Sequence, residues 1–200
     1  MQPDIPQGRK RPAQPVYLRN SITQLFFVMK HISFRKFETH DKDACLIAFN
    51  SNVPRFFALH EVSLFDNFLD HIDDQHINDK YFEKTRFYVI ESDGQLVGCG
   101  GFGYNKEPDE VILAWGLIHR GFHRQGLGNE LLTYRLQRIK EYYPTADVRI
   151  DTTQFSAPFF EKHGFVTTKV TPDYYAAGMH RYDMVLNRTP TKPTCKNLYF

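Results

Sequence analysis

Two glycines within the segment His119–Leu132 stand where a chain can hold a pyrophosphate. Gly126 and Gly128 tolerate positive φ angles and allow the backbone to approach an anion closely. The helix predicted to follow them presents free N–H groups and the positive end of its dipole at the same point. Arg124, just ahead of the glycines, supplies a cation that can clamp phosphates from the side. The spacing indicates an anion cradle at the start of a helix.

The elements on either side of this segment support that interpretation. The run Val111–Ile118 is apolar and rich in β-forming residues, so it predicts a central strand buried on both faces. The helix after the glycines carries one apolar stripe that can pack on a sheet. This stripe consists of Leu132, Leu136, Ile139 and Tyr143. Neither the Rossmann glycine pattern nor the Walker phosphate loop fits residues 116–132, so those two kinds of nucleotide site lose support.

Two motifs resemble those of a known family. The stretch His123–Gly128 resembles the acetyl-CoA-binding motif R/Q-x-x-G-x-G/A of the GCN5-related N-acetyltransferase (GNAT) superfamily, with His123 at the usual Arg or Gln position. The stretch Phe159–Phe165 is similar to the F-Y-E-K-x-G-F signature of that superfamily, in which a helix ends at a glycine, here Gly164. The motifs stand in the usual order and separation, and the resemblance covers residues 30–188, most of the chain.

The resemblance implies a fold and a cofactor. We expect an α/β layered fold with a mixed, mostly antiparallel sheet of six to seven strands, helices on both faces and a splayed central strand pair. The cleft between the splayed strands is expected to hold the pantetheine arm of the cosubstrate acetyl-CoA, and the glycine turn its pyrophosphate. The cofactor-binding residues implied are Leu117, Ile118, His119, Arg124, Gln125, Gly126, Leu127, Gly128, Asn129 and Phe160.

Periodicity and turn signals predict the remaining elements. Asp93-Gly94 is a strong hairpin turn between two β-rich runs. The expected elements are a strand at 32–37, helices at 41–52 and 56–73, hairpin strands at 86–91 and 95–104, the strand 111–118, a helix at 127–142, a strand at 147–152, a helix at 156–163 and two final strands.

Acyl transfer to an amine requires a group that accepts a proton, because a lysine-like amine has a pKa near ~10.4. Glu110 precedes the apolar strand and shares a strand face with Ile112 and Gly116. Some members of the superfamily use as base a glutamate at the position of Ile112 here. Glu110 is therefore the candidate general base, and an exposed carboxylate at a strand end is the alternative.

The leaving thiolate must gain a proton. Many relatives supply it from a tyrosine at the position that Phe160 occupies here, so this phenol is missing. A thiolate with a pKa near ~8.5 is not a poor leaving group, and solvent or another phenol can protonate it. Tyr104, Tyr174 and Tyr175 are the other phenols considered, and each is equally explained as packing or as a pocket wall.

The sequence thus predicts an N-acetyltransferase that moves an acetyl group from acetyl-CoA to a primary amine by direct attack in a ternary complex. The alternative is a non-catalytic acyl-CoA-binding or regulatory GNAT-like module, which Phe160 and the lack of a glutamate at position 112 motivate. The acceptor is either a small-molecule amine or a protein amine, and a dimer is left open as the oligomeric state.

Composition restricts the other functions. A formal net charge of +2 on 200 residues gives no general case for nucleic-acid binding. Three widely spaced cysteines without ligand spacing predict reduced thiols, a cytoplasmic location and no metal site. No apolar run approaches the roughly 20 residues of a membrane span, so no membrane association is expected. We expect one N-acetyltransferase domain at residues 29–188, between a flexible basic N-terminal tail, 1–28, and a C-terminal tail, 189–200.

Overall fold

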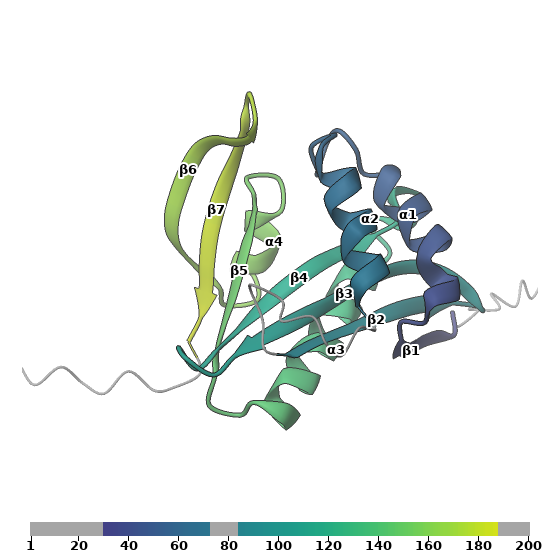
Figure 1. The fold of residues 1–200 in the computed structure, drawn as a ribbon, viewed down its shortest axis with the longest axis horizontal. Helices are drawn as coiled ribbons and strands as arrows, with labels where there is room; N and C mark the ends of the chain where they lie inside the picture. The colour runs from purple at the N-terminus through teal and green to yellow at the C-terminus, as the bar shows by residue number, and fades with distance from the viewer. Residues whose placement is uncertain (1–29, 73–83, 188–200) are drawn as a thin grey trace, which may run out of the picture.

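Seven strands form one sheet in the computed structural model, which describes residues 30–72 and 84–187 (Figure 1). The strands are β1 (Ile32–Lys36), β2 (Lys84–Ser92), β3 (Gln95–Asn105), β4 (Glu110–Ile118), β5 (Asp147–Thr153), β6 (Val166–Ala176) and β7 (Met179–Leu186). Their order across the sheet is β1-β2-β3-β4-β5-β7-β6. Neighbouring strands are antiparallel except β4 and β5, which are parallel. The expected mixed, mostly antiparallel sheet is confirmed.

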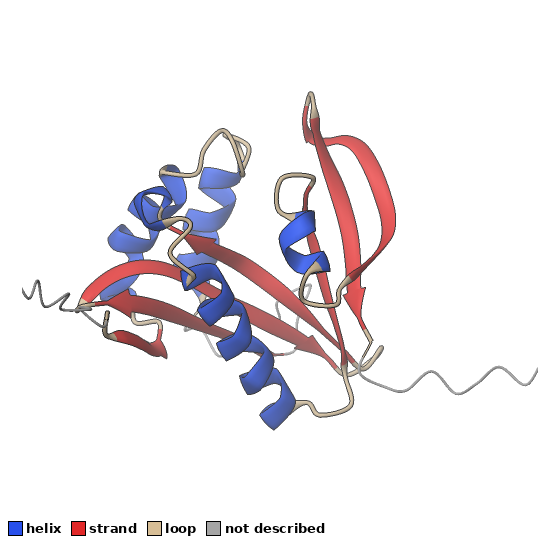
Figure 2. Cartoon of the chain, turned by 180° about the vertical axis from the view of Figure 1, so that it is seen from behind, coloured by secondary structure: helices blue, strands red, loops and turns tan. Residues whose placement is uncertain are grey.

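Helices cover both faces of this sheet, as the two opposite views show (Figures 1 and 2). The α-helices are α1 (Lys42–Asn50), α2 (Glu61–His71), α3 (Leu127–Tyr142) and α4 (Ala157–Glu161). Phe49 of α1 and Phe65 of α2 pack in one buried cluster with Val89 of β2. Leu132 of α3 and Phe160 of α4 belong to a second cluster on the other face. Two apolar layers therefore hold the sheet between them.

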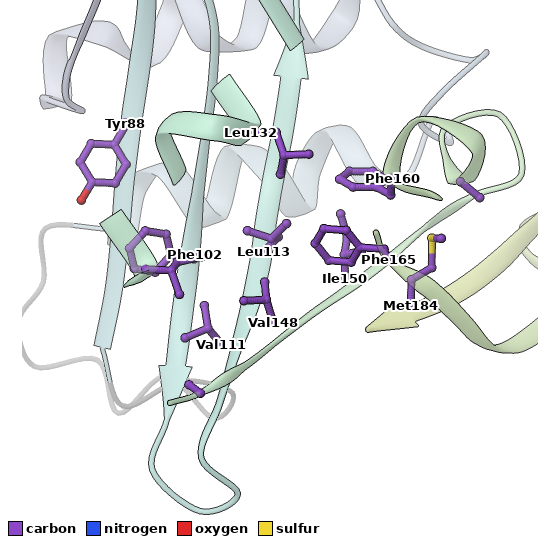
Figure 3. Close-up of a cluster of buried hydrophobic side chains, with 13 residues drawn as sticks. Tyr88, Phe102, Val111, Leu113, Leu132, Val148, Ile150, Phe160, Phe165 and Met184 are labelled. Carbon is purple, nitrogen blue, oxygen red and sulfur yellow. The ribbon is translucent and has the colours of Figure 1, made fainter. Parts of the chain in front are cut away.

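Figure 3 shows the second cluster, which joins α3 and α4 to the strands beside the site. Phe160 lies close to Phe165, with 5.5 Å between the ring centroids. Gly164 takes a φ of 87° and ends the helical segment, so the chain turns back into β6. This arrangement confirms the C-cap expected at Gly164, although α4 is shorter than the predicted helix 156–163.

A bulge in β4 changes the face to which its side chains point. Two residues of β4, which lie between Ala114 and Leu117, stand opposite the single residue Gly100 of β3. The first of them, Trp115, takes a φ of 46°. An extra residue shifts the alternation of a strand by one. Leu113 therefore packs in the α3 layer, whereas Leu117 packs in the layer of α1 and α2.

The parallel pair of strands separates soon after it forms. β4 and β5 pair only through Glu110–Ile112 and Asp147–Arg149. Farther along, β5 pairs with β7 on its other side through Thr153, and β4 pairs with β3 through Ile118. The two strands diverge at that end, as Figure 1 shows. The splayed central pair is confirmed, and it leaves one edge of β4 open.

Helix boundaries show where the sequence pattern was misleading. The predicted helix 127–142 matches α3, whereas the predicted helix 56–73 begins only at Glu61. The carboxylate of Glu61 accepts a hydrogen bond from the Ala58 N–H at 2.6 Å, which holds the preceding residues in turns. The end of this predicted helix at Asp73 and the predicted tails, 1–28 and 189–200, lie outside the described residues. No helix within the described ranges is long and apolar enough to cross a membrane.

Candidate active site

A cleft of about 850 Å³ opens where β4 and β5 part. Its walls include Ile112–Ile118 of β4 and Ile150–Thr153 of β5, together with residues of the glycine turn and of the connection between α1 and α2. Backbone N–H and C=O groups on the open side of β4 have no strand partner beyond Ile112. An extended ligand with amides can pair with such an edge as a further strand would.

Side chains close the far end of this open edge. The Ile118 carbonyl accepts a hydrogen bond from Nδ2 of the buried Asn52 at 2.9 Å and lies 2.8 Å from Nε2 of His123. Asn52 also donates to the Ala48 carbonyl, and it thereby ties the end of α1 to β4. The Leu117–Ile118 segment is consequently held rigidly from both the α1 side and the turn side.

The turn between β4 and α3 exposes free donors to the cleft. Arg124 and Gly126 take left-handed φ angles of 61° and 83°. The N–H groups of Asn129 and Glu130 donate to the Gly126 carbonyl, so the helical bonding of α3 starts there. The N–H groups that precede this bonding lie at the positive end of the helix dipole. Such a terminus binds phosphate groups.

Arginines add positive charge around the mouth of the cleft. Arg55, Arg120 and Arg124 are exposed and line it. Cζ of Arg55 lies 5.6 Å from the ring centroid of Phe56, another lining residue. Cations on two separate connections, one between α1 and α2 and one between β4 and α3, can bind an anionic ligand of several phosphates from different sides.

A buried carboxylate lies at another part of the cleft wall. Glu61 at the start of α2 is 8% exposed. Burial raises the pKa of Glu61 above its ordinary value; the hydrogen bond from Ala58 opposes this shift, and the charge of Asp151 reinforces it. A carboxylate with a raised pKa, next to a cleft, is suited to accept a proton near neutral pH.

A phenol stands beside that carboxylate. The hydroxyl of Tyr175 on β6 donates to Oδ2 of Asp151 on β5 at 2.7 Å. Burial raises the pKa of Tyr175 well above its ordinary value, and the charges of Asp151 and Glu61 raise it further. Tyr175 therefore keeps its proton at neutral pH. The cleft thus combines a glycine turn at the start of a helix, an open strand edge, a buried carboxylate and a protonated phenol.

The sequence of this chain matches the model of a known protein family. The family model described as the acetyltransferase (GNAT) domain matches residues 55–188. The chain belongs to the GNAT family. A search of the curated proteins finds no match to this GNAT chain.

Solved GNAT structures share the fold. A GNAT-family acetyltransferase from Desulfovibrio desulfuricans is 20% identical, with a TM-score of 0.61 over 80% of this chain and 100% of that one. The ribosomal-protein-S18-alanine N-acetyltransferase from Escherichia coli is 17% identical, with a TM-score of 0.61 over 85% and 100%. An acetyltransferase from Salmonella typhimurium with its cofactor acetyl-CoA is 14% identical, with a TM-score of 0.61 over 81% and 96%. At these identities the likeness shows the fold.

The GNAT cleft gathers most of the cofactor-binding residues expected from the resemblance. Those that line it are Leu117, Ile118, Arg124, Gly126, Gly128, Asn129 and Phe160. Three others do not. The His119 side chain accepts from the Gly121 N–H, Gln125 accepts from Lys30, and Leu127 is buried beside Leu131. The contacts of all of these residues with a cofactor stay predictions.

Glu110 lies apart from the GNAT cleft. It is absent from the lining, and its Oε2 forms an ion pair with Nε of Arg149 at 2.6 Å. It stands where β4 and β5 are still paired, opposite Asp147. The role of Glu110 as the base stays a prediction that this position does not support.

The phenols considered from the sequence separate clearly. Tyr175 lines the cleft, whereas Tyr104 stacks on Tyr143 with 3.9 Å between centroids and does not line it. Tyr174 is exposed, and Cζ of Arg181 lies 4.9 Å from its ring centroid. Within the part of the chain that the structure describes, no three His, Cys, Asp or Glu side chains gather to hold a metal ion.

Sequence reasoning missed several residues of the cleft wall. Glu61 and Arg135 each interrupt the buried face of a helix, and a charge at such a position is a signal that could have identified them. Asn52 follows α1, and no pattern in the surrounding residues marks it as part of the cleft wall. Asp151 shares the alternation of β5 with the exposed Arg149, so the sequence makes it resemble an ordinary surface carboxylate.

Proposed function

We propose that the protein is an acetyl-CoA-dependent N-acetyltransferase that acetylates a primary amine by direct attack in a ternary complex. The observation that carries this proposal is that one cleft contains the glycine turn, the open edge of β4 and the buried carboxylate of Glu61. Membership of the GNAT family supports the same activity.

The donor occupies the part of the cleft between the turn and β4. The N–H groups at the start of α3 and the guanidinium of Arg124 bind the pyrophosphate of acetyl-CoA. The pantetheine amides pair with the open edge of β4 that leads up to Leu117 and Ile118, short of the Ile118 carbonyl that Asn52 and His123 already contact. Phe160 contributes an apolar wall from α4.

The acceptor enters beside α2 and β6, where the carboxylates lie. The amine arrives as an ammonium, which Asp151 attracts, and it loses a proton to Glu61. The neutral nitrogen attacks the thioester carbonyl, so that a C–N bond forms and the C–S bond breaks. The leaving thiolate takes a proton from Tyr175, which solvent then restores. No covalent enzyme intermediate is needed.

The acceptor belongs to the primary amines, as either a small molecule or a protein amine. Phe57 and Phe155 line the same cleft as the two carboxylates and give it apolar walls. This combination favours an amine whose cationic end is carried on an apolar or aromatic group. Cys45 and Cys99 are buried free thiols, which supports a cytoplasmic location.

The test measures acetyl-CoA binding by calorimetry and, in the same preparation, the amine-dependent release of free thiol. The panel of amines includes a diamine, an aminoglycoside, and peptides with a free N-terminus or a lysine. Saturable binding with thiol release from one amine class is expected. Binding without release from any amine would favour the non-catalytic acyl-CoA-binding module. Absence of binding would overturn both functions.

A further inference from the structure

One buried cation has no role in the function proposed above. Arg135 of α3 is 2% exposed, and it lies on the helix face that also buries Leu131, Leu132 and Ile139. Transfer of a guanidinium out of water is costly unless hydrogen bonds and an opposite charge compensate for it. Arg135 therefore needs hydrogen-bond acceptors and an opposite charge close to its guanidinium.

The protein itself leaves this guanidinium largely unpaired. Nη1 donates to the Gly101 carbonyl at 3.3 Å, and Nε has no hydrogen-bond partner. Among the described residues, no carboxylate forms an ion pair with Arg135. Burial raises the pKa of the neighbouring Cys99 thiol, which is therefore neutral. Burial lowers the pKa of Arg135 to about 10, so the group is still a cation at neutral pH.

The sheet is built with room for the guanidinium at the bulge of β4. A Cβ atom on Gly116 would lie 2.6 Å from Nη2 of Arg135, and one on Gly100 would lie 3.2 Å from Nη1. Any larger residue at Gly116 would displace the guanidinium. Gly116 and Arg135 both line the cleft. The cation thus forms part of the cleft wall directly behind the open edge of β4.

This wall lies where the acyl end of the donor is expected. Arg135 is about 13 Å along α3 from Gly126, at about 1.5 Å per residue. The pantetheine arm is comparable with about four extended residues, which span about 14 Å. A donor whose pyrophosphate binds at the start of α3 therefore carries its thioester to the level of Arg135.

We propose that Arg135 binds the terminal carboxylate of a short dicarboxylic acyl group, so that the protein uses malonyl- or succinyl-CoA in preference to a neutral acyl-CoA of the same length. The inference rests on the proposed function, because it places the donor in the same cleft. The carboxylate that Arg135 binds belongs to the acyl-CoA and not to the amine. Glu61 and Asp151 line the acceptor part of the cleft and repel an anionic acceptor.

Transfer of the dicarboxylic group follows the same balance as acetyl transfer. The amine nitrogen attacks the thioester carbonyl, the C–N bond forms and the C–S bond to coenzyme A breaks. The proton from the amine passes to Glu61, and the thiolate gains one from Tyr175. The distal carboxylate stays ionised and is unchanged in the product amide.

Calorimetry with malonyl-CoA and with butyryl-CoA tests the inference, because the two acyl chains match in length and differ in charge. Wild-type protein is expected to bind malonyl-CoA at least tenfold more tightly than butyryl-CoA. Arg135→Met should abolish this difference, and Arg135→Lys should keep part of it. Arg138→Met is the matched control, since Arg138 on the same helix pairs with Glu141 at 2.8 Å and does not line the cleft.

The wild-type comparison can overturn the inference even if Arg135→Met does not fold. Equal affinity of the wild-type protein for malonyl- and butyryl-CoA, together with intact acetyl-CoA binding, would overturn this inference and leave the proposed function standing. Loss of discrimination in Arg138→Met as well as in Arg135→Met would also overturn it. Failure of every acyl-CoA, including acetyl-CoA, to bind would overturn the proposed function itself.

Discussion

The hydroxyl of Tyr175 donates a 2.7 Å hydrogen bond to Asp151, and this contact fixes a phenol of β6 against β5 in the cleft wall. Phe160 supplies no proton, because it has no hydroxyl group. The raised pKa of Tyr175 keeps its hydroxyl protonated at neutral pH, so this proton is available to the sulfur as negative charge develops there. The geometry therefore supports Tyr175 of β6 as the proton donor, in place of a tyrosine at the position of Phe160 on α4.

Tyr175→Phe is expected to lower kcat by about 100-fold, because a positioned acid contributes that order of magnitude to proton transfer. KM for acetyl-CoA should stay within threefold, roughly, since the phenol acts on the leaving group and not on the bound donor. Steady-state thiol release measures both constants. Tyr174→Phe, which alters an exposed neighbour, is the control and should leave kcat unchanged. An unchanged kcat in Tyr175→Phe would remove the acid role.

Glu61→Gln should lower kcat by about 100-fold, because the amide cannot accept the amine proton. The amide oxygen still accepts from the Ala58 N–H, so the start of α2 should be preserved. In the wild-type protein, kcat/KM should rise with pH as Glu61 ionises. This rise should lie above the ordinary pKa of 4.5, because the pKa of Glu61 is raised. The pH profile of thiol release measures it.

Glu110→Gln serves as the paired variant for this experiment. Glu110 forms an ion pair with Arg149 outside the cleft lining, so its loss should leave kcat within about threefold of the wild-type value. A large loss in Glu110→Gln with a normal rate in Glu61→Gln would reverse the assignment and restore the base expected from the sequence.

Periodicity predicted the fold well where local patterns decide the structure. The stripe of α3 and the glycine at its start fixed that helix at 127–142, and Asp93-Gly94 fixed the hairpin through two left-handed residues. The helix expected from Phe56 begins later, because residues 56–60 form turns and Glu61, which accepts from the Ala58 N–H, caps the start of α2. Such a cap depends on side-chain geometry that a hydrophobic pattern does not contain.

The chemistry of the site was harder to predict because it is assembled from distant segments. Glu61, Asp151 and Tyr175 come from α2, β5 and β6, and only the sheet order brings them to one cleft. The bulge at Trp115 reverses the faces of the residues after it, and nothing in an apolar run marks where an extra residue is inserted. The guanidinium of Arg135 packs against Gly116 in this bulge, so its place in the cleft wall could not be predicted either.

Gly126→Ala should weaken acetyl-CoA binding by at least about tenfold, because the anion cradle depends on the backbone of this turn. Its φ of 83° lies in the left-handed region, where a side chain costs roughly 1–2 kcal/mol. A Cβ at this position meets no protein atom within 4 Å, so the effect on the protein is backbone strain alone. Calorimetry measures the loss of affinity for acetyl-CoA, and thermal unfolding measures the loss of stability from backbone strain.

Gly94→Ala separates strain from ligand binding. Gly94 takes a φ of 79° in the β2–β3 turn, and a Cβ there also meets nothing within 4 Å. This variant should lose a similar free energy of unfolding while its affinity for acetyl-CoA stays that of the wild-type protein. An equal loss of affinity in both variants would show that stability, and not the cradle, governs binding.

Asp41 should make the free energy of unfolding depend on pH in the acid range. Its carboxylate is 4% exposed and accepts from Nη1 and Nη2 of Arg35 at 2.6 and 2.8 Å, and from the Glu38 N–H at 2.9 Å. Burial acts to raise the pKa of Asp41, but these hydrogen bonds outweigh burial and hold the pKa below its ordinary value of 3.8. The ionised form therefore stabilises the folded state.

The sign of the effect follows from that lowered pKa. The contribution of Asp41 is complete above its unfolded pKa and is lost as the pH falls through its folded pKa. Asp41→Asn should lower the free energy of unfolding by about 2 kcal/mol at pH 7, since it removes charge-assisted hydrogen bonds. The difference from wild type should shrink below the ordinary pKa. Urea unfolding at several pH values measures it, with the exposed Asp43→Asn as the control, and a difference that stays constant down to the acid limit would contradict this origin of the stability.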